Sequence, residues 1–298
     1  MAVLATTDIT LPTNIAAGLF QKATTGSVVS VLSGSEPMLF GDVDVMTLDS
    51  LPRAEYVGEG ADKSHTTAGF GTKTIKPHKV QVTMRFNQEV QWADEDYQLG
   101  VLTTLANAGG LALARALDLG AIHGINPLTG DAVSSIPVGD RIATTTNEEA
   151  IGDDPDLDFE NAAGLVIADG YVPNGVAFDP SFAWTLATAR YDDGRKKFPE
   201  LGLGINVSAF EGVAASTSTT VSGQPEADDT GVRAIIGDWS LLRWGVQRRV
   251  PVELIQFGDP DGQGDLKRKN QIAMRLEVVY GWAVMDLAGF ATLNVAGS

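Results

Sequence analysis

The feature that most constrains the fold is a long strand pattern with nothing nearby in the sequence to cover it. After Pro77 the side chains alternate strictly, and the apolar face consists of Val80, Val82, Met84 and Phe86. An extended stretch at residues 56–60 and a polar tip at 63–67 precede it, which predicts a protruding hairpin over residues 54–86. An isolated two-stranded hairpin is marginally stable in water. We therefore expect a neighbouring subunit to cover part of its apolar face.

The most helical part of the chain lies at residues 94–123. It opens with acidic residues, which suit the positive end of a helix dipole, and apolar residues then recur at helical spacing. Gly109 and Gly110 interrupt this pattern at a cost of about 1 kcal/mol each relative to alanine. The glycine pair predicts a bend or a close approach of another segment.

The rest of the chain alternates short helices and strands. Helices are predicted at residues 157–169 and 180–189, the second capped by Asp179. Strands are predicted at residues 28–32, 175–178, 235–238, 246–257 and 272–282. The polar stretch at 214–220 predicts a surface loop, and the turn at 258–265 predicts the tip of a second hairpin. Together these patterns indicate an α+β fold.

Composition excludes several classes of protein. The 298 residues leave one or two domains open, and the absence of cysteine removes disulfides, thiolate zinc sites and cysteine nucleophiles. A net charge of −17 is the wrong sign for gripping phosphate backbones, but it suits a wall that encloses nucleic acid without adsorbing it. We expect no signal peptide and no apolar stretch long enough to cross a bilayer.

No constellation of catalytic or metal-binding residues stands out. His65, His78 and His123 lack the spacing of a metal site. The sequence contains neither a nucleophile elbow nor a phosphate-binding loop. We therefore expect no metal, no cofactor and no small-molecule catalysis.

Charged residues in the last third allow two interpretations each. Asp259, Asp261 and Asp265 could form a calcium loop, but Asn270 stands where a bidentate glutamate is required, so a hairpin turn explains them better. The basic runs at 248–249 and 267–269 are either solvated strand edges or partners for acidic neighbouring subunits. We favour pairing between subunits over contact with nucleic acid.

The order of arm, hairpin, long helix, α/β portion and returning strand pair resembles the major capsid proteins of tailed bacteriophages, which share the Hong Kong 97-type capsid fold. The resemblance covers nearly the whole chain. Its local phrases are Tyr56-Val57-Gly58-Glu59-Gly60, Phe178-Asp179-Pro180-Ser181, Tyr191-Asp192-Asp193-Gly194-Arg195, Ile236-Gly237-Asp238-Trp239-Ser240, Gly281-Trp282-Ala283-Val284 and Ala288-Gly289-Phe290. Each phrase is weak alone, but their order and spacing together are specific.

The resemblance implies a division of the chain into four parts. These are an N-terminal arm at 1–53, an E-loop at 54–86, a peripheral domain with the spine helix at 87–133 completed by 246–284, and an axial domain at 134–245 completed by 285–298. In this fold axial domains meet around fivefold and sixfold axes, while E-loops lie over adjacent subunits. The E-loop residues expected at such contacts are Glu59, Lys63, Phe70, Val80, Val82, Met84 and Phe86.

The function implied is structural. Pentamers and hexamers of the chain would form an icosahedral phage head that encloses double-stranded DNA without specific binding, in the virion, after assembly in the host cytoplasm. A portal, decoration proteins and a separate scaffolding protein are the partners implied, and no membrane is. A bend at Gly109 and Gly110 would let one sequence serve flat hexamers and curved pentamers. The alternative is an encapsulin-like compartment that encloses cargo proteins, against which the long E-loop argues.

Some members of the family also form a covalent cross-link. An E-loop lysine bonds to an asparagine in another subunit's peripheral hairpin with help from a buried glutamate, and the matching residues here are Lys63, Asn270 and Glu277. A shielded glutamate can accept the lysine proton, so that the neutral amine attacks the carboxamide and releases ammonia. The odd spacing from Asn270 to Glu277 requires a turn between them if both are to reach one site. Noncovalent clamping by the E-loop is the default expectation for this chain.

Overall fold

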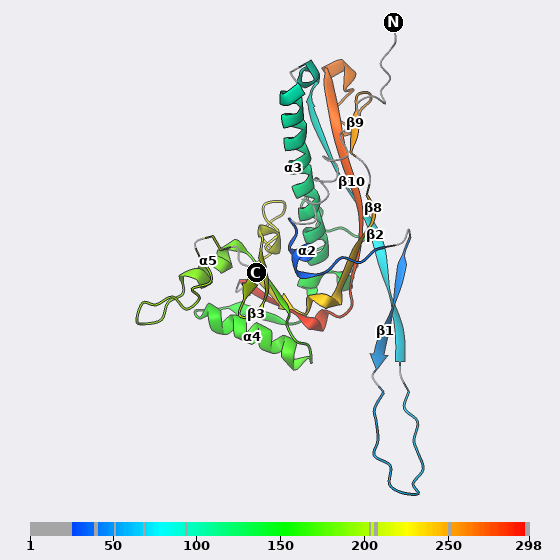
Figure 1. Ribbon diagram of the computed structural model, residues 1–298, viewed down its shortest axis with the longest axis vertical. Coiled ribbons are helices and arrows are strands. Elements are labelled where there is room, and N and C mark those ends of the chain that lie inside the picture. The colour runs from blue at the N-terminus through cyan, green and yellow to red at the C-terminus, as the bar shows by residue number, and fades with distance from the viewer. Residues whose placement is uncertain are drawn as a thin grey trace.

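Two β-sheets and one long helix organise the molecule (Figure 1). The computed structural model describes residues 26–38, 41–50, 52–67, 69–92, 95–202, 204–205, 208–249 and 252–295. Its helices are α2 (Val28–Leu32), α3 (Glu95–Ile122), α4 (Pro155–Ala168) and α5 (Pro180–Thr188). Its strands are β1 (Val43–Ser50), β2 (Gly69–Asn87), β3 (Glu148–Ile151), β4 (Gly175–Phe178), β5 (Ala209–Phe210), β6 (Val213–Thr217), β7 (Val232–Gly237), β8 (Leu242–Arg249), β9 (Glu253–Ile255), β10 (Gln271–Val284) and β11 (Phe290–Val295). Its short 3-10 helices include η3 (Val138–Asp140), η5 (Thr219–Val221) and η7 (Lys267–Lys269).

The first sheet follows the long axis of the molecule. Its strands run in the order β1-β2-β10-β8, with β9 also on β10, and every pair is antiparallel. Residues 76–87 of β2 pair with β10, whereas residues 69–75 pair with β1. α3 lies along one face of the part formed by β2 and β10 (Figure 1).

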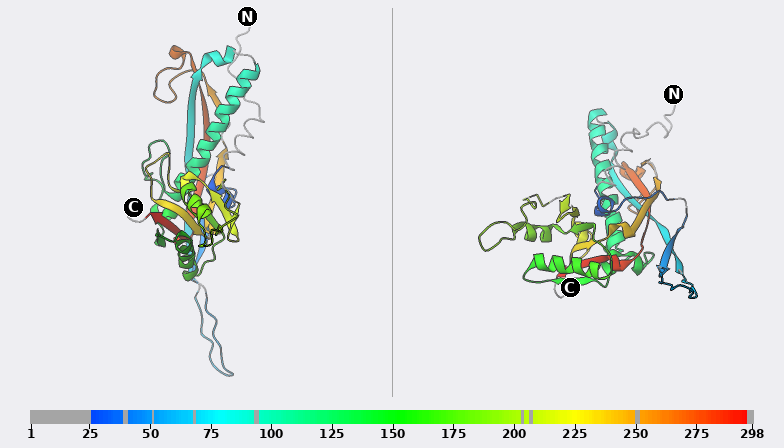
Figure 2. Two further views of the ribbon diagram at one scale, coloured as in Figure 1. Left: turned by 90° about the vertical axis from the view of Figure 1, so that its left-hand side faces the viewer. Right: turned by 60° about the horizontal axis from the view of Figure 1, so that its bottom comes forward.

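The predicted hairpin of residues 54–86 is wrong in its second arm, which belongs to the body of the molecule. Val80, Val82, Met84 and Phe86 are half-buried and pack into the chain's own core. The physical reason is long-range pairing: β10 supplies the missing strand and α3 covers the apolar face, so no neighbouring subunit is required there. The hairpin that does protrude consists of β1, residues 69–75 of β2 and the connecting residues 52–67 (Figure 2).

The predicted long helix is confirmed as α3. Of the two explanations for its glycine pair, close approach is confirmed at Gly109, where an added Cβ would lie 3.0 Å from Leu276 and 3.1 Å from Met84. The bend in assembled shells stays a prediction. By length and composition alone, the segment Leu102–Ile122 could span a bilayer, contrary to our expectation, but most of it is buried inside the fold.

The second sheet has six strands in the order β3-β11-β7-β4-β6-β5, with both parallel and antiparallel pairs. The predicted helices at 157–169 and 180–189 are confirmed as α4 and α5, and the strands at 175–178 and 235–238 as β4 and β7. Asp179 caps α5 as expected, because its Oδ1 accepts a hydrogen bond from Ser181 N at 2.8 Å. In the last third, β8 and β10 confirm two strands, although β8 begins earlier than predicted and β9 follows it as a separate strand.

Two local predictions are wrong, and contacts between distant segments explain both; β6, for example, pairs with β4. Residues 28–32 form the helix α2 instead of a strand, and residues 214–220 form most of β6 and part of η5 instead of a surface loop. The buried Asp118 of α3 accepts hydrogen bonds from Val28 N at 3.0 Å and from Thr220 Oγ1 at 2.9 Å. A partner so distant in sequence is invisible to local pattern.

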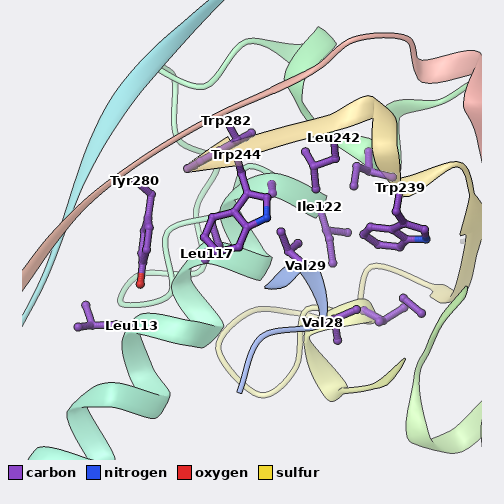
Figure 3. Packing of buried hydrophobic residues seen from close by; sticks show 14 of the residues in the cluster. Val28, Val29, Leu113, Leu117, Ile122, Trp239, Leu242, Trp244, Tyr280 and Trp282 are labelled. Carbon is purple, nitrogen blue, oxygen red and sulfur yellow. The ribbon is translucent and has the colours of Figure 1, made fainter. Parts of the chain in front are cut away.

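The largest core lies where the two sheets, α2 and α3 meet (Figure 3). Aromatic side chains fill it, among them Trp239, Trp244, Tyr280 and Trp282 (Figure 3). Burial of side chains of this size supplies much of the hydrophobic stabilisation of a domain. This core packs the two sheets, α2 and α3 against one another, and the protruding hairpin extends from the part of the molecule that it holds together.

Candidate intersubunit surfaces

A two-stranded ribbon, made of β1 and residues 69–75 of β2, projects from the body and ends in a tip at residues 52–67 (Figures 1 and 2). The register pairs Met46 with Thr72, and Phe70 lies two residues from Thr72 along β2, so Met46 and Phe70 share one face of the ribbon. Met46 is 72% exposed and Phe70 is 69% exposed. Within the described residues no third strand pairs with this ribbon, so two large apolar side chains on it are exposed to water, and this face is suited to contact with another surface.

The tip is extended and exposed, and it is braced by polar contacts across its two arms. Glu55 accepts hydrogen bonds from Ser64 N at 2.7 Å and from Ser64 Oγ at 2.5 Å, and these bonds lower the pKa of the Glu55 carboxyl. Thr66 Oγ1 donates to Arg53 O at 2.7 Å. Glu59 and Lys63, both predicted contact residues, lie in this exposed tip.

The base of the ribbon is fixed to the body by one lysine. Lys73 Nζ lies 3.3 Å from Asp140 Oδ1 and 3.2 Å from Gly139 O, and it also donates to Val284 O. Neither Lys73 nor Asp140 was singled out from the sequence, because isolated charged residues carry no motif.

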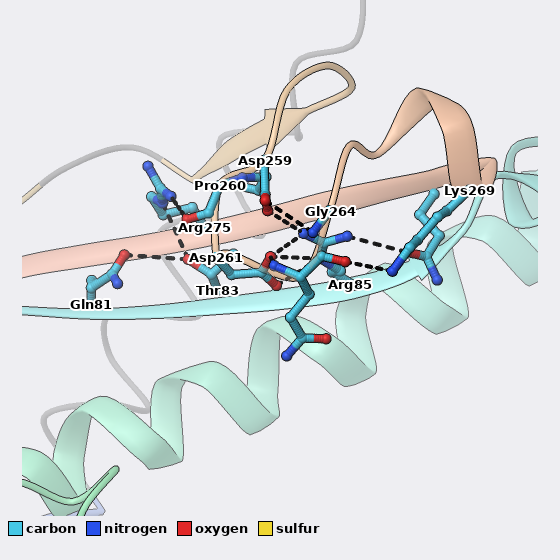
Figure 4. Close-up of polar contacts among 11 residues, drawn as sticks. Gln81, Thr83, Arg85, Asp259, Pro260, Asp261, Gly264, Lys269 and Arg275 are labelled. Carbon is cyan, nitrogen blue, oxygen red and sulfur yellow. Dashed lines mark hydrogen bonds and ion pairs between the residues drawn. The ribbon is translucent and has the colours of Figure 1, made fainter.

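At the opposite end of the long axis from the tip, the loop between β9 and β10 is held by a polar network (Figure 4). Arg85 binds Asp261, with Nε 2.6 Å from Oδ2, and lies 2.9 Å from Asp259 Oδ1. The hydrogen bond from Arg85 lowers the pKa of the Asp261 carboxyl. These carboxylates therefore serve a hairpin turn, as the sequence favoured. No group of residues fit to hold a metal ion occurs in the described ranges.

The three residues that match the family's cross-link do not come together within one subunit. Lys63 lies in the tip, and Asn270 ends the basic η7 at the far end of the molecule in a left-handed conformation, with φ 50°. Glu277 lies within β10, where it forms an ion pair with Lys79 at 2.9 Å. The turn required between Asn270 and Glu277 is missing, because β10 is continuous from Gln271 onwards. At ~3.3 Å per residue the two lie on the order of 20 Å apart along the strand.

A buried carboxylate joins three segments of the body. The Asp118 side chain accepts hydrogen bonds from Ser27 Oγ, from Val28 N and Val29 N, and from Thr220 Oγ1. It therefore ties α2 and η5 to α3. Burial raises the pKa of the Asp118 carboxyl, and the hydrogen bonds oppose that rise. An acidic residue in an apolar helix is the one local feature that points to this junction.

The three histidines lie apart from one another. His65 is exposed in the tip, His78 packs on Trp282 with ring centroids 4.7 Å apart, and His123 Nε2 lies 2.9 Å from Val221 O. Burial lowers the pKa of His78 and of His123. Both therefore act as packing residues.

No family model matches the chain. A curated relative, described as "Probable major capsid protein gp17" of Mycobacterium phage D29, is 25% identical over 253 residues, which cover 81% of this chain and 76% of that protein. A solved chain from Mycobacterium phage Ogopogo is 48% identical with a TM-score of 0.82, and the match covers 91% of this chain and 92% of that one. A solved chain from Gordonia phage Cozz is 33% identical with a TM-score of 0.79, covering 91% of this chain and 87% of that one.

These similarities agree with the geometry. They extend over most of the chain, since each of these two structural matches covers 91% of it. They favour a phage capsid over an encapsulin-like compartment, and a structural role over an enzymatic one. The chain belongs to the tailed-phage major capsid protein family, and it is a structural protein of the virion capsid.

Proposed function

We propose that copies of this chain assemble as pentamers and hexamers into a closed icosahedral head around double-stranded DNA, and that the ribbon and tip form an E-loop that clamps an adjacent subunit. The observation that carries the clamp is the exposed apolar pair Met46 and Phe70 on one face of the ribbon. The opposite face of the ribbon turns Ile75 and Lys73 toward the chain's own body. The outward face is therefore the one available to a neighbour.

The energy available at this face suits a repeated contact. Full burial of one large apolar side chain stabilises an interface by about 1.5–3 kcal/mol. A closed shell repeats the contact in every subunit, so contacts that are weak singly hold together as a set. Single clamps can then form and break during assembly, while the finished shell lasts.

Charge supports a noncovalent clamp between the two ends of the molecule. The tip carries exposed Glu59 and Asp62, and η7 at the opposite end carries the exposed basic run Lys267, Arg268 and Lys269. An exposed ion pair contributes at most about 1 kcal/mol. Pairs of this kind would therefore add little to the strength of the contact. Their main effect would be to set the register between copies.

The acidic charge of the chain suits an enclosing wall. With a net charge of −17, the chain would repel packaged DNA on average, so the polymer stays mobile inside the shell. The same proposal includes assembly in the host cytoplasm with a portal, a separate scaffolding protein and decoration proteins as partners.

Paired substitution on the ribbon tests the clamp. Met46→Ser with Phe70→Ser should leave the thermal unfolding of the unassembled chain unchanged and should abolish closed shells in electron micrographs. Leu128→Ser is the matched control, because Leu128 is 91% exposed in a turn away from the ribbon. Normal shells from the double variant would refute the clamp, as would equal loss of shells from the control.

A further inference from the structure

The ammonium group of Lys73 contacts three oxygen atoms of the body at one place. Lys73 Nζ donates hydrogen bonds to Gly139 O and Val284 O, and it forms an ion pair with Asp140 Oδ1 at 3.3 Å. The acceptors belong to η3 and to the last residue of β10. One side chain thus joins the ribbon to two separate segments of the body.

The Lys73 contact lies where it can restrain rotation of the ribbon about its base. The pairing of β2 with β10 ends where Lys76 meets Trp282, and beyond that point the described part of β2 pairs with β1. Lys73 lies three residues further out, at the start of the projecting ribbon. Ile75 adds an apolar contact at the same base, since it is buried beside Gly281. The lysine therefore lies beyond the pivot, where it resists rotation of the ribbon.

The acceptor side of the contact is itself fixed. Asp140 is buried, and its Oδ1 also accepts a hydrogen bond from Val284 N at 3.3 Å. Trp282 Nε1 donates to Asp140 O at 3.1 Å. These bonds attach η3 to the end of β10. The acceptors of Lys73 are therefore held in place by the sheet.

We propose that Lys73 is a positioning residue that sets the angle of the E-loop relative to the body and so selects the geometry at which one subunit meets the next. This inference rests on the proposed function of the ribbon as a clamp. Without the two hydrogen bonds and the ion pair of Lys73, the ribbon keeps its own pairing but swings about residues 75–76. If the angle of the ribbon varies, the angle between neighbouring subunits varies too, and shells of different curvature result.

The absence of cysteine makes the angle measurable. Spin labels on Phe70→Cys in the ribbon and Ile167→Cys in α4 report the distance between ribbon and body, and both positions are exposed. Loss of Phe70 also keeps the chain unassembled if the clamp is as proposed. The lever from Ile75 to Phe70 is about 17 Å, so a swing of roughly 15° displaces the label by about 4 Å.

Lys73→Met should broaden or shift the distance distribution by several ångströms, and with Phe70 restored it should yield shells of mixed size. Lys76→Met is the matched control, since it removes the same charge from an exposed position on the other face of β2; its distribution should equal that of the parent. If Lys73→Met does not fold, Lys73→Gln takes its place in the same measurement. An unchanged distribution refutes the role of Lys73. Failure of the clamp itself is seen separately, as normal shells from the Met46 and Phe70 double variant.

Discussion

Replacing Gly120 with alanine should destabilise the fold, although alanine is the better helix former. A Cβ at Gly120 would lie 2.7 Å from Trp282 Cη2 and 3.0 Å from Cζ2. Carbon atoms in normal contact are about 3.5–4.0 Å apart. Trp282 cannot easily move, because it is 3% exposed, donates to Asp140 O at 3.1 Å and packs on His78.

The magnitude follows from two opposing terms. Removing a glycine from a helix gains up to about 1 kcal/mol, and forcing an extra methyl into a tight core costs about 1–3 kcal/mol. We expect the contact with a rigid indole to cost near the upper end, so the free energy of unfolding should fall by about 1–2 kcal/mol. Gly164→Ala in α4 is the control, because nothing lies within 4 Å of its added Cβ, and it should stabilise the fold by about 0.5–1 kcal/mol.

Guanidinium unfolding of the unassembled chain, followed by tryptophan fluorescence, measures both variants. The two alanines should shift the midpoint in opposite directions. A midpoint for Gly120→Ala at or above that of the parent would show that the core around Trp282 adapts freely, which would refute the packing argument.

Three further changes have definite expected outcomes. Asp118→Ala should lower the free energy of unfolding by roughly 3–5 kcal/mol in the same assay, because buried donors of α2 and η5 lose their acceptor; a loss under about 1 kcal/mol would contradict the junction. The hydrogen bond from Arg233 lowers the pKa of Asp229 to about 2, so this pair stabilises the fold above pH 3.8 and loses its contribution as the pH falls towards 2. Asp229→Asn should therefore cost under about 1 kcal/mol at pH 7, after solvent screening, and nothing near pH 2; an equal cost at both values would be the wrong result. Gly109→Ala with Gly110→Ala should leave the chain folded and impair closed shells in electron micrographs, and normal shells would remove the proposed role of this pair.

The parts of the fold that local pattern predicts are those whose stability is local. Helical periodicity in adjacent residues predicts α3, α4 and α5, and the local cap Asp179 adds to the prediction of α5. The strand alternation at Val80 to Phe86 was also read correctly as strand. The strand that pairs with it, β10, could not be predicted, because β10 lies almost two hundred residues further along the chain. No local signal distinguishes a strand that has a partner on its edge from one that has none.

The functional surfaces follow the same rule. The extended tip with Glu59 and Lys63 was placed correctly on an exposed surface, since its polar, glycine-containing sequence suits nothing else. Met46 was missed because β1 pairs with residues 69–75 across a loop, and only that pairing shows its exposed face. Lys73 was missed because the three acceptors that give it meaning come from three positions far from it in sequence.

The cross-link is decided by denaturing electrophoresis of mature particles. The separation of Asn270 from Glu277 and the pairing of Glu277 with Lys79 support noncovalent clamping. We expect a single band near 31.4 kDa. A ladder of higher bands that Lys63→Ala or Asn270→Ala abolishes would contradict that expectation.

The most direct measurement of the whole account is cryo-electron microscopy of particles assembled from this chain, at a resolution that traces residues 43–75. The account predicts a closed shell in which the ribbon lies over an adjacent subunit, with Met46 and Phe70 buried in that contact and Lys73 still bound to Asp140. A closed shell in which this ribbon folds back on its own subunit, or in which both apolar side chains stay exposed to solvent, would contradict it.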